Sequence, residues 1–112
     1  MEMCERTKKF ALAIIDFTES LPSDKTSDLI GKQLLRCGTS VGANYRASRR
    51  AKSKADFISK LGTVEEEADE CMYWLELLSE KCPHKKENIE KLRTEANEIT
   101  SIIVASIKTA RQ

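Results

Sequence analysis

The strongest constraint on the fold is an apolar repeat in residues 57–78. Apolar side chains recur there at alternating spacings of four and three residues: Phe57, Leu61, Val64, Ala68, Cys71, Leu75 and Leu78. A helix with 3.6 residues per turn places all of these positions on one narrow stripe. Such a rhythm is typical of nearly aligned antiparallel helices, so it predicts that this segment is one helix of a bundle.

Apolar stripes of the same kind mark three further segments. They consist of Phe10, Ile14, Phe17 and Leu21 in the first, Ile30, Leu34, Cys37 and Val41 in the second, and Ile89, Leu92, Ala96, Ile99, Ile103, Ser106 and Ala110 in the last. We expect helices at residues 2–20, 26–51, 54–82 and 85–110. With 40% hydrophobic and 33% charged residues and only two prolines, the chain is predicted to be all-α. The expected fold is a single domain, residues 1–112, forming an antiparallel up-down-up-down four-helix bundle.

Capping residues support two of these boundaries. Thr26, Ser27 and Asp28 each offer a side-chain oxygen to the start of the second helix. Ser53 and Asp56 have the spacing of a capping box, in which Ser53 is the N-cap and the carboxylate of Asp56 reaches back. The third helix is therefore expected to begin at residue 54.

Three glycines in the second segment, Gly31, Gly38 and Gly42, lie on a face next to its apolar stripe. A glycine inside a helix costs about 1 kcal/mol relative to alanine, so three of them predict that another helix presses closely against this face. The glycine pair at 38 and 42 has the spacing of a membrane-helix contact motif. Arg36 and Arg46 exclude a membrane location and favour tight packing between soluble helices.

Charge is sorted along the chain, although the net charge is only +1. Residues 25–60 carry nine basic and two acidic side chains, and residues 61–80 carry seven acidic and none basic. A basic cluster ends the second helix and continues into the next: Arg46, Arg49, Arg50, Lys52 and Lys54. It could track the phosphates of RNA or DNA. Alternatively, it is a solvated turn or pairs with the acidic helix of its own or a neighbouring chain.

The residues of an enzyme or metal site are not apparent. A di-iron bundle needs Glu-x-x-His pairs, and the single histidine, His84, has no glutamate three positions before it. Cys82 and His84 form at best part of a zinc site, which needs four ligands. We therefore expect no cofactor, no metal and no catalytic residues. Without an export signal, a membrane span or paired cysteine motifs, a cytoplasmic location is expected.

Asn44 is an amide on or beside the apolar stripe of the second helix. A buried amide without a hydrogen-bond partner costs about 1–3 kcal/mol. The structural interpretation is that Asn44 bonds to Ser40, to nearby backbone or to another helix. The alternative is contact with a ligand.

The third helix also predicts association between chains. Between residues 71 and 78 it carries one charged residue, Glu76, so its apolar surface exceeds one stripe. The side chains that point away from the stripe are Met72, Tyr73, Trp74 and Leu77. Exposed apolar patches usually mark interfaces, and Trp and Tyr are common anchors there. We expect a homo-oligomer, with Trp74 buried in the assembly and the sorted charges meeting head to tail, as in a ring.

Three stretches taken together resemble the four-helix-bundle proteins encoded in intervening sequences of bacterial 23S ribosomal RNA genes. They are Gln33–Arg46, Ser53–Leu61 and Glu66–Leu78. At Ala47 and Ser48 the chain departs from the family pattern, which usually has an acidic residue followed by a small one. The resemblance implies a ring, commonly a pentamer, and no catalytic residues. It also implies kinship with retroelement accessory proteins, which bind nucleic acid and a reverse transcriptase.

Overall fold

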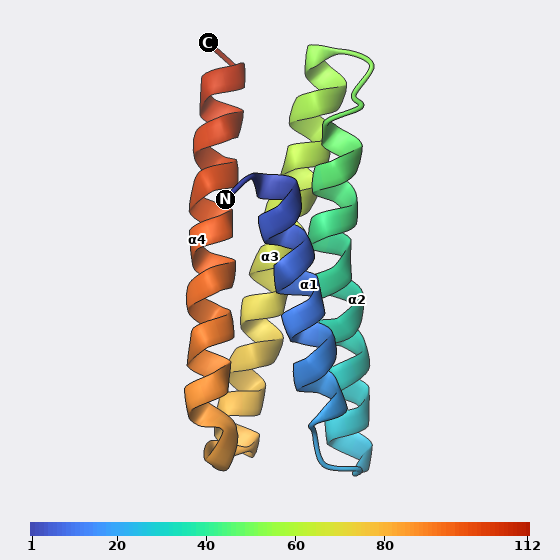
Figure 1. The fold of residues 1–112 in the computed structure, drawn as a ribbon, viewed down its shortest axis with the longest axis vertical. Helices are drawn as coiled ribbons and strands as arrows, with labels where there is room; N and C mark the ends of the chain where they lie inside the picture. The colour runs from blue at the N-terminus through green and yellow to red at the C-terminus, as the bar shows by residue number, and fades with distance from the viewer.

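The computed structural model describes residues 1–112, and it consists of four helices and one short helical turn (Figure 1). The helices are α1 (Met3–Glu19), α2 (Lys25–Ser48), α3 (Lys54–Lys81) and α4 (Lys86–Ala110), with a 3₁₀ turn, η1 (Pro83–Lys85), before α4. They run alternately down and up in a rod of 45 × 21 × 19 Å. The predicted all-α up-down bundle is therefore confirmed. None of the helices combines the length and the hydrophobicity that crossing a bilayer requires.

The repeat in α3 forms the centre of the bundle. Six of its seven predicted positions, Leu61 to Leu78, are completely buried, and Phe57 at the helix start is half-buried. The predicted buried positions of α4 were wrong at its C-terminal end. Ile107 is buried there, whereas Ser106 and Ala110 are only half-buried. A helix with 3.6 residues per turn drifts relative to a repeat of 3.5, so a long stripe moves to a neighbouring position.

The α1–α2 contact confirms the interpretation of the glycines. A methyl group built on Gly38 would lie 2.8 Å from Cγ2 of Ile14, and one on Gly42 would lie 3.3 Å from the carbonyl oxygen of Thr7. Both distances are too short for an ordinary contact. The space that a Cβ would take is occupied by the Ile14 side chain at Gly38 and by the α1 backbone at Gly42, so both glycines lie where α1 approaches α2 closely.

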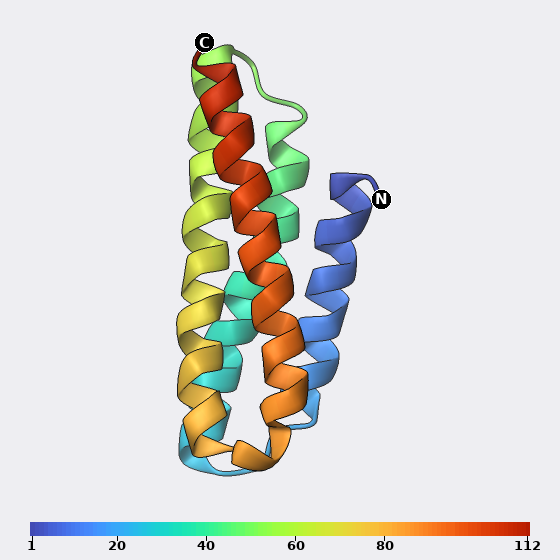
Figure 2. The ribbon, with the colours of Figure 1, turned by 90° about the vertical axis from the view of Figure 1, so that its left-hand side faces the viewer.

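The bundle closes where α1 meets α4. The guanidinium of Arg6 donates two hydrogen bonds of 2.7 and 2.8 Å to the carboxylate of Glu95, and a third of 2.9 Å to Glu98. Such a bidentate pair fixes both distance and orientation. Figure 2 shows that α1 begins well below the α2–α3 turn, so α1 does not reach this end of the rod.

Both ends of α2 differ from the prediction. The N-cap of α2 is Asp24, whose carboxylate accepts from the backbone N–H of Ser27 at 2.8 Å, so the helix begins before Thr26. It also ends at Ser48 rather than at residue 51. The N–H groups of the next three residues bond to carbonyls three positions back, which tightens the chain into a turn.

The predicted capping box of α3 is present in a modified form. The hydroxyl of Ser53 accepts from the N–H of Asp56 at 3.0 Å, as expected. The Asp56 carboxylate reaches back one residue further, to the N–H of Lys52. The turn between α2 and α3 is therefore held from both sides.

Candidate nucleic-acid and oligomer interfaces

The basic cluster lines a hollow at the end of the rod. The hollow has a volume of about 390 Å³ and lies beside the C-terminal end of α2, the following turn and the first turns of α3. Arg46, Arg50, Lys52 and Lys60 contribute the basic side chains. Asp56 is the one acidic residue there, and its carboxylate bonds to the Lys60 ammonium at 2.6 Å. That bond, with the N–H of Lys52, lowers the pKa of Asp56.

The structure divides the five predicted contact residues. Three of them, Arg46, Arg50 and Lys52, line this hollow, which we call the basic hollow. Arg49 does not line the hollow and lies near the N-terminal residues Glu2 and Cys4. The pKa of the Glu2 carboxyl is lowered chiefly by the hydrogen bond from the N–H of Cys4, and the charge of Arg49 adds to this lowering. The ammonium of Lys54 donates to the carbonyl of Gln112 at 3.4 Å. The expected position on α2 was wrong for Arg49 and Arg50, which follow the end of the helix.

None of the five residues forms an ion pair. The acids of the chain pair instead with Arg6, Arg36, Lys60, Lys91 and Arg93. An unpaired cation at a surface keeps its full attraction for an external anion, because no carboxylate must first be displaced. The basic hollow is therefore suited to a phosphate group.

The C-terminal end of α4 also lies at this end of the molecule, although none of the predicted contact residues is on α4. Exposed Lys108 and Arg111 border a neighbouring hollow with Glu65, and the bond from Lys54 to Gln112 shows that the end of α4 adjoins the start of α3. Figure 2 shows the C-terminus beside the α2–α3 turn. The sequence does show Lys108 in the last turn of a helix and Arg111 just beyond it, but only the topology brings them to this end.

The apolar patch on α3 is centred on Tyr73, which is 54% exposed. Its ring meets the indole of Trp74 edge to face, with centroids 5.1 Å apart. Leu77 follows one turn later on the same side. The indole N–H donates to the carboxylate of Glu70 at 3.0 Å, which fixes the ring and is the main reason that the pKa of Glu70 is lowered.

This patch is smaller than the sequence indicated. Met72, Trp74 and Leu77 are each half-buried against the core of their own chain. Neighbouring residues of a helix are about 100° apart, so Met72 and Trp74 lie on opposite sides of Tyr73. The patch on the α2 side therefore consists of Tyr73, Trp74 and Leu77.

Part of the sorted charge is neutralised within the subunit. Arg36 of α2 bridges to Glu67 at 3.1 Å and to Glu70 of α3. These contacts correspond to the alternative in which the basic and acidic helices of one chain pair. Glu66, Asp69 and Glu80 remain exposed on the outer side of α3 without a basic partner.

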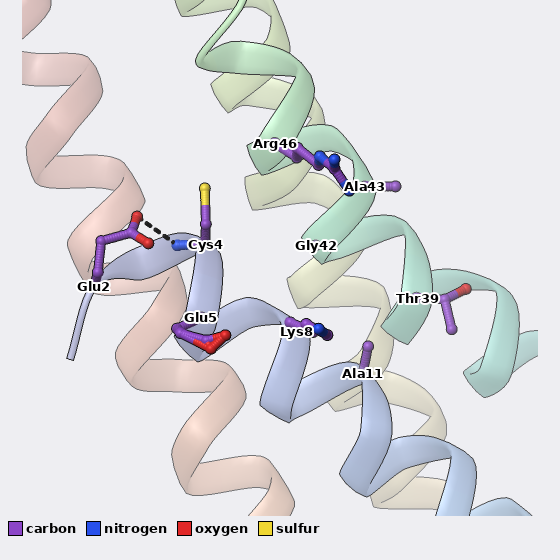
Figure 3. A pocket seen from close by; sticks show the side chains of 9 residues that line it. All are labelled: Glu2, Cys4, Glu5, Lys8, Ala11, Thr39, Gly42, Ala43 and Arg46. Atoms are coloured by element: carbon purple, nitrogen blue, oxygen red, sulfur yellow. Dashed lines mark hydrogen bonds between the residues drawn. The ribbon is translucent and has the colours of Figure 1, made fainter.

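A second hollow, of about 410 Å³, lies between the first turns of α1 and the C-terminal half of α2 (Figure 3). Small side chains line it on α2, including Gly42 and Ala43, and charged groups such as Lys8 and Arg46 surround it. Arg46 and Ala43 line both hollows. We call it the α1–α2 hollow; no sequence pattern predicted it, because it arises from the close approach of the two backbones.

Comparison with known proteins identifies the family. Residues 1–105 match the 23S rRNA-intervening sequence protein family. The chain belongs to this family. A crystal structure from Bacteroides thetaiotaomicron, described as a protein of unknown function from the S23 ribosomal protein family, is 36% identical over 96% of this chain and 99% of its own, with a TM-score of 0.89. No curated protein matches the chain.

As in the family pattern, the stretch Gln33–Arg46 forms most of α2 of this intervening sequence protein. Asn44 within it is half-buried, and its amide donates to the carbonyl and hydroxyl oxygens of Ser40 at 2.9 and 2.7 Å. Its hydrogen bonds agree with the structural interpretation. Ala47, which follows this stretch, lines the basic hollow together with Arg46 and Arg50.

The remaining candidates do not assemble into a site in this intervening sequence protein. His84 is exposed in η1, and Cys82 beside it is buried. No group of three or more histidine, cysteine or acidic residues comes together in a way that could hold a metal ion.

Proposed function

We propose that this chain is a non-enzymatic subunit of a homo-oligomeric ring, a scaffold that contacts nucleic acid. The observation that carries the proposal is the Tyr73–Trp74–Leu77 patch in the C-terminal half of α3. An isolated subunit would present these side chains to water, whereas a neighbouring subunit would cover them. Five subunits are expected, as the family resemblance implies.

A ring needs two different surfaces on each subunit, because a head-to-tail contact is not self-complementary. The α1–α2 hollow supplies a concave surface, lined by the cations Lys8 and Arg46 and by the acids Glu2 and Glu5. The patch supplies a convex one, flanked by the unpaired acids Glu66 and Asp69. In the proposed contact the patch enters the hollow, and its two acids pair with Lys8 and Arg46, which favours one register.

The non-enzymatic part of the proposal is supported by the placement of the reactive side chains. The only imidazole, His84, is exposed in a turn and has no hydrogen bond to a serine, a cysteine or a carboxylate. Nucleophilic catalysis requires such a base within hydrogen-bond reach of its nucleophile.

Light scattering tests the assembly. At tens of micromolar concentration we expect a mass about five times that of the 12.7 kDa subunit. Tyr73→Lys places a charge in the patch and should shift the mass toward one subunit. Val104→Lys is the matched control, because Val104 is also exposed (45%) but lies on α4. A monomeric wild type would contradict the proposal.

A second candidate function is that of a dedicated RNA- or DNA-binding accessory protein of a reverse transcriptase. The unpaired cations of the basic hollow favour it. Replacing Arg46, Arg50 and Lys52 by glutamine should weaken binding to mixed RNA and DNA and reduce the salt slope by about 0.7–0.9 per lost phosphate contact.

The matched control replaces Lys81, Lys85 and Lys86, at the opposite end of the rod, and removes the same charge. If both triple variants lose affinity equally, the basic hollow is not the contact surface. Tight binding of the wild type at physiological salt would favour the accessory function. If the wild type does not bind even at low salt, the scaffold function stands and the contact with nucleic acid is contradicted.

A further inference from the structure

Two cysteine side chains meet inside the bundle. Cys37 of α2 and Cys71 of α3 are each completely buried, and their Sγ atoms are 3.1 Å apart. Both are free thiols. The remaining two cysteines lie elsewhere, Cys4 in the first turn of α1 and Cys82 before η1.

The separation of the two sulfur atoms is unusually small for packing alone. Carbon atoms in contact lie about 3.5–4.0 Å apart, and sulfur is larger than carbon. A disulfide bond is about 2.05 Å long, so the two atoms need to approach by only about 1 Å to be joined. The helices that carry them are already held side by side by the bridge from Arg36 to Glu67 and Glu70.

We propose that Cys37 and Cys71 are an oxidation site at which an intrachain disulfide fastens α2 to α3. The oxidant is a peroxide. One thiol attacks the peroxide O–O bond, which yields a sulfenic acid and one water. The second thiol then attacks that sulfur, the S–OH bond breaks, the S–S bond forms, and its proton leaves with the hydroxyl as a second water.

Burial makes the reaction slow but selective. The thiol–thiol hydrogen bond and desolvation raise the pKa of Cys71, so the reactive thiolate is scarce while the core is closed. Oxidation therefore follows transient opening of the bundle. Once one sulfur has been oxidised, reclosing of the core brings the other within bonding distance before a second peroxide reacts.

The bond should be visible as a gain in thermal stability. It would close a loop of 35 residues between two helices that are neighbours in the native state, and cross-links of this length restrict the unfolded chain. We expect a rise in the melting temperature on the order of 10 °C. Reduction with dithiothreitol should reverse it.

The test uses the chain with Cys4→Ser and Cys82→Ala, which leaves only the buried pair. After overnight incubation with hydrogen peroxide a few degrees below the melting temperature, we expect residues 37 and 71 together to have lost two hydrogens, separately from any oxygen that the three methionines gain. Peptide mapping should join the fragments that contain residues 37 and 71. The melting temperature should then have risen.

Cys37→Ala in the same background is the control, and its mass should increase through addition of oxygen while its melting temperature does not rise. If the two cysteines instead gain oxygen without losing hydrogen, or if both remain thiols, the proposal is wrong. A disulfide between chains, seen as a doubled mass on a non-reducing gel, would equally overturn it.

Discussion

The contacts on the two sides of α2 are built in opposite ways. Toward α1, the helices approach through glycines, and no ion pair joins them. Toward α3, the contact consists of larger buried side chains, with the Arg36 bridge and the aromatic patch beside it. The α1 side depends on residues without a side chain, and the α3 side depends on large side chains that fill the core. The two sides should therefore respond differently to mutation.

The largest effect is expected from removing atoms on the α3 side. Leu75 is completely buried in the centre of the apolar repeat. Leu75→Ala leaves a cavity in addition to losing apolar contact, which should reduce the free energy of unfolding by about 2–5 kcal/mol. Urea denaturation would measure this. A loss below 1 kcal/mol would show that the core can collapse around the missing side chain.

An intermediate effect is expected from adding one carbon on the α1 side. Gly38→Ala would place a methyl group 2.8 Å from Ile14. Overpacking costs about 1–3 kcal/mol, against which alanine regains about 1 kcal/mol of helix propensity, so we expect a net loss of up to about 2 kcal/mol. Gly62→Ala is the matched control.

No atom lies within 4 Å of the position that a methyl group would take at Gly62. That variant should gain about 0.5–1 kcal/mol in the same denaturation experiment. The clash can also be tested by a double-mutant cycle, because Ile14→Ala removes the atoms that Gly38→Ala would meet. If the two changes are additive, the close approach of α1 does not explain the glycine.

The smallest effect is a pH dependence on the α3 side. The pKa of Glu70 is lowered by the indole N–H of Trp74 and by Arg36, so its contribution to stability is complete above the unfolded value of about 4.5. That contribution is lost as the pH falls through the lower folded value. Trp74→Phe removes the N–H donor, so the stability lost between pH 5 and pH 3 should be smaller than in the wild type.

Thermal unfolding across this pH range would measure the difference, which should be less than either preceding effect because Glu70 is partly exposed. An unchanged pH profile in the variant would mean that the hydrogen bond does not set the pKa. Ser79→Ala, on the same helix but without contact to Glu70, provides the control.

The fold could be predicted from the sequence because the signal was repeated. Six buried positions of α3 follow one rhythm, and the glycines of α2 had a cost that only a close neighbour could explain. The helix ends were less predictable, because a single capping side chain can set where a helix begins. Asp24 caps α2, although each of the three residues Thr26, Ser27 and Asp28 also has a side-chain oxygen that could cap it.

The candidate site was predictable in composition but not in arrangement. Arg46 and Arg50, four positions apart, reach the same hollow, whereas Arg49 does not line it. Lys108 and Arg111 join this end only through the topology of the bundle. Trp74 is half-buried against the core of its own chain, and its indole N–H bonds to Glu70, a contact for which the sequence has no distinct signal.

Arg46 lines both the basic hollow and the α1–α2 hollow, and this shared side chain has a thermodynamic consequence. If a neighbouring subunit fills one hollow and a phosphate the other, the two ligands draw on the same guanidinium. Each event then changes the affinity of the other by the same factor, since coupling free energies are reciprocal. Assembly of the ring and occupancy by nucleic acid would be linked equilibria, and the salt concentration that releases one would shift the other.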